Sequence, residues 1–217
     1  DGVEIGTRQM KLALRRLRRF TREGAQDELD LDGTITRTAR NAGFLDIAHR
    51  PERKNRVKLL LLLDVGGSMD DHIDLVQQLF SAARSEFSQL EVFYFHNCIY
   101  ERVWRGNGIT RSGMLPTDEL VRTYGPDYRV VFVGDASMSP YEITEPGGSV
   151  EHWNEVAGAV WLQKILTRWE RAAWINPIPE DHWRYTQSIQ ILSRILKGRM
   201  MPLTLAGLDA ATAELRK

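Results

Sequence analysis

The hydrophobic pattern of the chain becomes regular near residue 55. Five consecutive leucines, Leu59–Leu63, form a run too short for a membrane span and typical of a strand buried on both faces of a parallel sheet. The run ends at Asp64, and the amphipathic pattern at about 72–88 predicts a helix. Further strands are predicted at 91–97, 99–104, 128–135, 172–176 and 200–203. The first strand of this series is predicted to span 56–64.

Helical patterns separate most of these strands. Helices are predicted at about 72–88, from Thr117, at 154–170, at about 186–197 and from Leu205. The strands at 91–97 and 99–104 follow each other too closely for a crossover helix, so they should pair as an antiparallel hairpin. The segments 105–116 and 136–153 contain several glycines and prolines and are predicted loops. This order predicts an α/β fold: a doubly wound, mostly parallel sheet with helices on both faces and one antiparallel strand.

Residues 1–54 precede this alternation and are predicted to form a separate N-terminal basic helical segment, with the α/β domain at 55–217. Apolar residues at three- and four-residue steps, with arginines between them, predict a helix over 7–23. Its basic surface has two interpretations: the solvated face of a packed helix, or a site for nucleic acid, an acidic partner or a membrane surface. The first is favoured, because the segment has neither interleaved aromatic residues nor a nucleic-acid motif.

The segment Asp30–Thr34 reads Asp-Leu-Asp-Gly-Thr and matches the Asp-x-Asp-Gly-Thr motif of haloacid-dehalogenase phosphotransferases. That motif requires a hydrophobic strand just before its first Asp, and the polar residues 22–28 do not provide one. A calcium-binding EF-hand is also excluded, because Ala39 occupies the twelfth position of the loop instead of Glu. We therefore expect helix capping, with Asp32 leading into a short helix over residues 34–42.

Composition narrows the class of protein. A hydrophobic content of 42% with 27% charged residues excludes a disordered chain. The single cysteine, Cys98, excludes an internal disulfide and fits a reducing compartment. There is no membrane-length apolar stretch and no signal-peptide pattern, so a cytoplasmic location is predicted. The chain begins with Asp1 instead of Met and is expected to be a fragment or a processed form.

Oxygen-bearing side chains are predicted to gather at the carboxyl edge of the sheet, where open α/β sheets bind their ligands. Asp64 and Ser68 follow the first strand, Thr117 begins the helix after the hairpin, and Asp135 ends the strand at 128–135. A set of oxygen ligands suits a hard divalent cation such as Mg²⁺ better than it suits zinc.

These residues resemble the metal-ion-dependent adhesion site of von Willebrand factor A (VWA) domains, which consists of Asp-x-Ser-x-Ser, a later Thr and a further Asp. Asp64, Ser68 and Asp135 match it directly, and Thr117 is preferred for the threonine, with Thr110 as the alternative. Gly66 stands where the family usually has its first serine. The resemblance implies bound Mg²⁺, or Mn²⁺ or Ca²⁺, with water in the position of the missing hydroxyl and a weakened cation site.

The nearer resemblance is to bacterial VWA proteins of the CoxE-like type, carried by Leu-Asp-Val-Gly-Gly-Ser-Met-Asp-Asp, Tyr-Phe-His-Asn-Cys and Gly-Arg-Met-Met-Pro-Leu-Thr-Leu. It implies a cytosolic interaction module, not an enzyme, that assists a MoxR-type AAA+ ATPase in enzyme maturation or complex assembly. An acidic residue of the partner, the ATPase or a client enzyme, would complete the coordination of the cation. The loop 136–153 would border this site, and its candidate partner contacts are Tyr141, Glu142, His152 and Trp153.

Two enzymatic alternatives use the same turn. Residues 66–70 contain part of the nucleophile-elbow motif, so Ser68 is a candidate serine-hydrolase nucleophile with a late histidine, His152 or His182, as its base. However, Asp70 replaces the final glycine of that motif. The turn could also bind phosphate at the N-terminus of the following helix, although no P-loop lysine follows the glycines.

Overall fold

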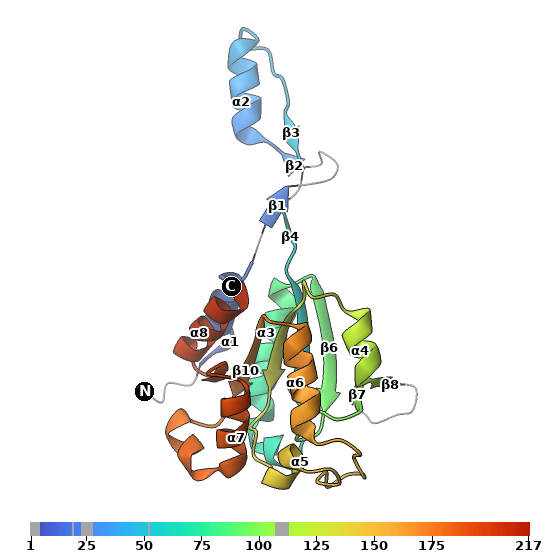
Figure 1. Ribbon diagram of the computed structural model, residues 1–217. Helices are drawn as coiled ribbons and strands as arrows, with labels where there is room; N and C mark the ends of the chain where they lie inside the picture. Colours follow the sequence, from blue (N-terminus) through green and yellow to red (C-terminus); the bar gives the residue numbers. More distant parts are fainter. Residues whose placement is uncertain (1–4, 19, 23–27, 52, 107–112) are drawn as a thin grey trace. The chain divides into compact units, whose positions relative to one another are not determined.

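The computed structural model describes residues 5–18, 20–22, 28–51, 53–106 and 113–217 (Figure 1). The chain divides into two compact units, one formed by Asp1–Leu17 with Val57–Lys217 and the other by Arg18–Arg56. This division differs from the predicted domains, 1–54 and 55–217. Helix α1 (Thr7–Arg15) belongs to the α/β unit because Met10, Ala13 and Leu14 are buried in one of its hydrophobic clusters. The helix is also shorter than the predicted 7–23, and strand β1 (Phe20–Arg22) begins soon after it.

The smaller unit consists of two short strand pairs and one helix. Strand β1 pairs with β4 (Arg53–Asn55), and β2 (Glu28–Leu29) pairs with β3 (His49–Arg50), both antiparallel. Helix α2 (Leu31–Arg40) begins before the predicted residue 34, because Asp30 caps it: the Asp30 carboxylate accepts a hydrogen bond from Gly33 N at 3.2 Å. The prediction of Asp32 as the capping residue is therefore wrong. The Asp-x-Asp-Gly-Thr pattern here is a helix start, and Arg50 pairs with Asp30 at 3.4 Å.

In the larger unit the described residues form a seven-stranded sheet in the order β11-β10-β9-β5-β6-β7-β8. Its strands are β5 (Lys58–Asp64), β6 (Gln89–Phe95), β7 (Arg102–Trp104), β8 (Met114–Pro116), β9 (Arg129–Val133), β10 (Ala172–Asn176) and β11 (Met200–Pro202). Strand β7 runs antiparallel to β6 and to β8, and the other described pairs are parallel. The α/β fold with one antiparallel strand is confirmed. Strand β8 lies in the segment 105–116, which was predicted as a loop.

Both faces of the sheet are covered by helices, as a parallel sheet requires (Figure 1). Leu59, Leu61 and Leu63 pack into a cluster with α1, α3 (Ile73–Glu86) and α8 (Leu205–Arg216). Leu60 and Leu62 point to the opposite face and join a second cluster. That cluster contains residues of α4 (Thr117–Thr123), α5 (Pro140–Thr144), α6 (Gly158–Arg168) and α7 (Gln187–Ile195). The leucine run therefore provides the core of both layers.

Among the described residues, two 3-10 helices and an unpredicted α-helix lie in the connections. Helix η1 (Gly67–His72) joins β5 to α3, and η3 (Glu180–Tyr185) precedes α7. Helix α5 lies within the segment 136–153, which was predicted as a loop. Its start carries Ser139 and, three residues later, Glu142, and each side chain caps a backbone amide of the other residue. This capping box is readable in the sequence and turns the Glu142 side chain back toward the start of the helix.

Candidate functional site

Asp64 is the central residue of the carboxyl edge of the sheet. Strand β5 lies between β6 and β9, so its last residue is enclosed by the ends of both neighbours. Asp64 is 4% exposed, and its Oδ1 accepts hydrogen bonds from Gly66 N at 2.9 Å and Asn97 N at 2.8 Å. Its second oxygen, Oδ2, is buried without a hydrogen-bond partner. One half of the carboxylate is thus held by backbone amides, and the other half has no hydrogen-bond donor.

Electrostatics at Asp64 disfavour its charge. Burial, the largest cause, together with the nearby carboxylates of Asp135 and Glu142, raises the pKa of Asp64 to about 7 against the lowering effect of the two backbone amides. Asp135 and Glu142 are each 2% exposed. In the described part of the chain, no lysine or arginine forms an ion pair with any of these three acids. Buried carboxylates are ordinarily paired or bound to a cation.

Asp135 is held at the edge by two hydrogen bonds. Its Oδ1 accepts a hydrogen bond from Ser137 N at 2.9 Å, and its backbone carbonyl accepts one from Asn176 Nδ2 at 2.9 Å. Gly134, directly before it, provides space for Asp64: a Cβ atom at Gly134 would lie 2.8 Å from Asp64 Cβ and 3.0 Å from Asp64 Oδ2. The structure therefore brings Asp64 close to the chain that carries Asp135.

Ser68 and Thr117, the two predicted hydroxyl ligands, have different surroundings. Ser68 is exposed on η1. Thr117 is fully buried, its hydroxyl donates to the Tyr100 carbonyl at 2.6 Å, and its amide donates to the Glu101 carbonyl at 2.8 Å. These bonds tie the start of α4 to the segment after β6, and the Thr117 hydroxyl oxygen keeps its lone pairs for another contact. Thr110, the alternative, lies outside the described residues.

Sequence reasoning missed Asn97 and misplaced Glu142. Asn97 follows β6 at the same edge, and its Nδ2 donates to Glu142 Oε1 at 3.2 Å and to Oε2 at 3.3 Å. Glu142 also accepts from Ser139 N at 3.2 Å, so it faces inward and is not an exposed partner contact. The available signals were an asparagine directly after a predicted strand and the Ser-x-x-Glu capping box.

The other predicted contact residues remain at the surface. Tyr141 and Trp153 are 68% and 76% exposed. His152 is fixed by its neighbours: Nε2 lies 3.1 Å from Glu101 Oε2, and its ring meets Tyr100 edge to face at 5.4 Å. Because an ionised carboxylate only accepts hydrogen bonds, His152 Nε2 is the donor in that contact.

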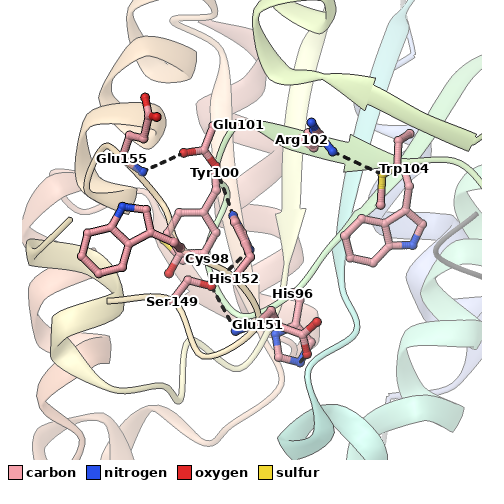
Figure 2. Close-up of a pocket in the computed structure, with 12 residues that line it drawn as sticks. His96, Cys98, Tyr100, Glu101, Arg102, Trp104, Ser149, Glu151, His152 and Glu155 are labelled. Carbon is pink, nitrogen blue, oxygen red and sulfur yellow. Dashed lines mark hydrogen bonds and ion pairs between the residues drawn. The ribbon is translucent and has the colours of Figure 1, made fainter. Parts of the chain in front are cut away.

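Two cavities flank this part of the molecule. One, of about 720 Å³, lies beside Asp64 and Gly66 and is lined further by Met69, Asp70 and Ile73. The other, of about 500 Å³, lies between the hairpin and the segment 149–155 (Figure 2).

Two histidine–carboxylate pairs line the second cavity (Figure 2). His96 lies 3.4 Å from Glu151, and His152 lies 3.1 Å from Glu101. Cys98 is buried there, and burial raises its thiol pKa to about 12, which makes the thiol unreactive.

The candidate ligands at the carboxyl edge carry oxygen atoms, which hard divalent cations prefer. Asp64 Oδ2 is a buried carboxylate oxygen with no hydrogen-bond partner, and the neighbouring candidates offer oxygen. Across the described residues, no three His, Cys, Asp or Glu side chains gather as a metal-binding group. A cation at this edge would therefore need hydroxyl or amide oxygens beside its carboxylates. The serine-hydrolase alternative finds no support in the contacts, because no hydrogen bond joins Ser68 to a histidine among the residues that the structure describes.

The mostly parallel sheet, its two helical layers and the acidic carboxyl edge define a Rossmann-like domain of the VWA class. Residues 4–102 match the family model described as VWA domain containing CoxE-like protein. The match supports a similarity to VWA domain proteins of the CoxE-like type; Asp64, Gly66 and Ser68 lie inside the matched segment, and Thr117 and Asp135 lie beyond it. Searches of curated proteins and of solved structures gave no match.

The family gives the class of function. VWA domains are generally non-catalytic interaction modules, and they commonly bind a divalent metal ion. This supports a metal-dependent interaction module at the level of the family. Among the helices that the structure describes, none has the length and apolar character needed to cross a membrane.

Proposed function

We propose that the carboxyl edge of the sheet binds a divalent cation, Mg²⁺ in the cell, and through it an acidic residue of a protein partner. The observation that carries this is the buried Asp64 carboxylate, whose Oδ2 has no hydrogen-bond partner and whose pKa is raised by the buried acids Asp135 and Glu142. Within the described structure, no lysine or arginine forms an ion pair with any of these three acids. Leaving a buried acid without a counter-charge is costly, and a bound cation supplies that charge.

The residues proposed to hold the cation are Asp64, Ser68, Thr117 and Asp135, with position 66 lacking a hydroxyl. Carboxylates and hydroxyls are ligands that Mg²⁺, Mn²⁺ and Ca²⁺ accept. When bound, the ion would offer an open coordination position to a carboxylate from outside. The exposed η1 turn that carries Ser68 and the cavity beside Asp64 leave room for such an approach.

The proposed partner is a MoxR-type AAA+ ATPase or a client enzyme that matures with its help. The support is the CoxE-like family match together with a surface suited to a partner. Tyr141 and Trp153 are large exposed side chains, and aromatic residues of this kind often anchor interfaces. We assign them as partner contacts, with His152 held beside them by Glu101.

Titration with Mg²⁺ and Mn²⁺ tests the cation site. Calorimetry and the thermal unfolding midpoint should both respond in the wild type, because a ligand that binds only the folded state stabilises it by about 2.7 kcal/mol at a concentration of 100 Kd. Asp64→Ala should abolish both responses. Asp71→Ala is the matched control, since Asp71 is an exposed acid on the nearby 3-10 helix η1, and the change should leave both responses unchanged.

A binding assay with the purified ATPase tests the partner. Capture of the ATPase by the wild type should require Mg²⁺ and be lost with EDTA and with Asp64→Ala. Equal capture in all three conditions would contradict a cation-dependent interaction.

A further inference from the structure

Position 66 has no room for a side chain, because Asn97 already occupies the space. A Cβ atom at Gly66 would lie 2.1 Å from Asn97 Oδ1 and 3.3 Å from Asp64 Oδ1. A side chain at position 66 would therefore displace the Asn97 amide, whereas the turn itself does not require glycine, because φ at Gly66 is an ordinary −58°. The Asn97 amide oxygen thus lies where the side chain of residue 66 would begin, next to the carboxylate of Asp64.

Asn97 is held in this place by its backbone and by its amide nitrogen. Its φ is +55°, a left-handed conformation that asparagine tolerates better than most residues. The backbone N–H donates to Asp64 Oδ1 at 2.8 Å, and Nδ2 donates to both oxygens of Glu142 at 3.2 and 3.3 Å. A carboxylate only accepts hydrogen bonds when ionised, so the NH₂ group must face Glu142. The amide oxygen is consequently the end that faces Gly66 and Asp64.

A separate observation points to a ligand beside the Asp64 carboxylate. Asp64 Oδ2 is buried, carries no hydrogen bond and belongs to a side chain that is 96% shielded. Asp64 therefore lacks a positive partner at Oδ2. Its Oδ1 is held by two backbone amides, and the Asn97 amide is held by Glu142. Amide carbonyl oxygens are ordinary ligands of hard divalent cations.

We propose that Asn97 Oδ1 is a cation ligand that replaces the side-chain oxygen absent at position 66, and that Glu142 is the residue that positions it. The inference rests on the proposed function, because it requires a cation beside Asp64. It changes the composition of the site: the coordination position expected to hold water receives a protein oxygen from the neighbouring strand end.

Three variants test whether a serine hydroxyl at position 66 can replace the Asn97 amide oxygen as a cation ligand. Asn97→Gly removes the amide at a backbone conformation that glycine adopts freely, and should weaken Mn²⁺ binding at least about tenfold. Gly66→Ser in the wild-type background should fold poorly, since its Cβ meets Asn97 Oδ1. Gly66→Ser combined with Asn97→Gly has the space and the hydroxyl, and should return Mn²⁺ affinity to within about threefold of the wild type. Binding is measured by calorimetry, and unfolding by urea in EDTA.

The control for the backbone is Lys197→Gly, because Lys197 is exposed and has the same left-handed conformation, with φ +52°. It should leave Mn²⁺ affinity unchanged. The role of Glu142 is tested by coupling: Glu142→Gln should weaken Mn²⁺ binding in the wild type and have no further effect in Asn97→Gly. A purely structural role of Glu142 would weaken both to the same extent.

The outcomes separate this inference from the proposed function. If the wild type binds Mn²⁺, Asp64→Ala does not, and Asn97→Gly binds as tightly as the wild type, the assignment of Asn97 is wrong and the cation site stands. If the double variant regains stability in EDTA but not Mn²⁺ affinity, Asn97 only fills space and the assignment is again wrong. If the wild type binds neither Mn²⁺ nor Mg²⁺, both proposals fail.

Discussion

Two regions of the α/β unit bury an acidic side chain in opposite ways. Between α1 and α3, the Glu86 side chain is 2% exposed and both of its oxygens accept from Arg15 Nε at 3.2 Å. At the carboxyl edge, Asp64 is as deeply buried, but its Oδ2 has no partner and its nearest charged neighbours are other acids. One acid is neutralised by the fold, and the other is not.

The difference separates a structural charge from a functional one. The Glu86–Arg15 pair joins the first helix to the domain, so its energy contributes to folding. At the carboxyl edge, by contrast, the neighbouring carboxylates of Asp135 and Glu142 raise the pKa of Asp64, and within the described residues no lysine or arginine pairs with it. Such a cluster is expected where the stabilising charge comes from outside.

The largest effect is expected at the paired acid. Arg15→Met removes the guanidinium and keeps much of the apolar stem, and should lower the free energy of unfolding by about 2–3 kcal/mol. The value lies below the usual range for buried pairs because the Arg15 side chain is 55% exposed. Urea unfolding measures the loss, which should not depend on Mg²⁺. Arg16→Met is the control: its pair with Asp209 is more exposed, and the change should be at most about 1 kcal/mol. Equal losses of unfolding free energy in the two variants would show that the Arg15–Glu86 pair is no more important than an exposed ion pair.

The next effect is steric and acts on the unpaired acid. In Gly134→Ala the new Cβ would lie 2.8 Å from Asp64 Cβ and 3.2 Å from the Trp174 ring, so the Asp64 side chain must move. We expect a loss of about 2 kcal/mol in EDTA, typical of overpacking, and weaker Mn²⁺ binding. Gly67→Ala is the matched control, because no atom lies within 4 Å of its added Cβ. Unchanged Mn²⁺ affinity in Gly134→Ala would show that Asp64 is not a ligand.

The same acid-to-amide change should act differently at the two acids. Glu86→Gln loses the charge that Arg15 needs, and should cost about 1 kcal/mol. Asp64→Asn keeps an oxygen for the two backbone amides and removes a buried charge, so it should cost nothing in EDTA. It should also abolish Mn²⁺ binding. Urea unfolding in EDTA and calorimetry check both statements. A similar loss at both positions would mean that Asp64 is as structural as Glu86.

The fold could be predicted from the sequence because its pattern is local. A run of leucines buried on both faces has few alternatives, and each helix shows its own periodicity. The predictions of the fold were wrong where contacts between residues distant in the sequence determine the structure. Helix α1 joins the α/β unit through Arg15 and its apolar face, and neither its partner Glu86 nor the end of the helix at Arg15 is visible in the local pattern.

The candidate site was predictable in its acids but not in its details. Asp64 ends one recognisable strand and Asp135 follows another by two residues, so their convergence at one edge follows from topology. Asn97 was missed because its role depends on the space at Gly66, which only three-dimensional packing reveals. Glu142 was placed at the surface because the segment 136–153 was taken as a loop, although the capping box at Ser139 turns it inward.

The smallest effect on stability is expected at Trp153, an exposed residue that belongs to the proposed partner surface. Trp153 is 76% exposed, and Trp153→Ala should change the free energy of unfolding by no more than about 0.5 kcal/mol. If it anchors a partner as proposed, the same change should weaken Mg²⁺-dependent binding of the ATPase at least about tenfold, since aromatic anchors carry much of an interface's energy. Tyr185→Ala is the matched control, an aromatic residue 72% exposed on η3 and outside both cavities. Mn²⁺ affinity should be normal in both variants, because neither residue touches the acids. A loss of binding with Trp153→Ala alone would separate the partner surface from the cation site, whereas equal losses would place the partner elsewhere.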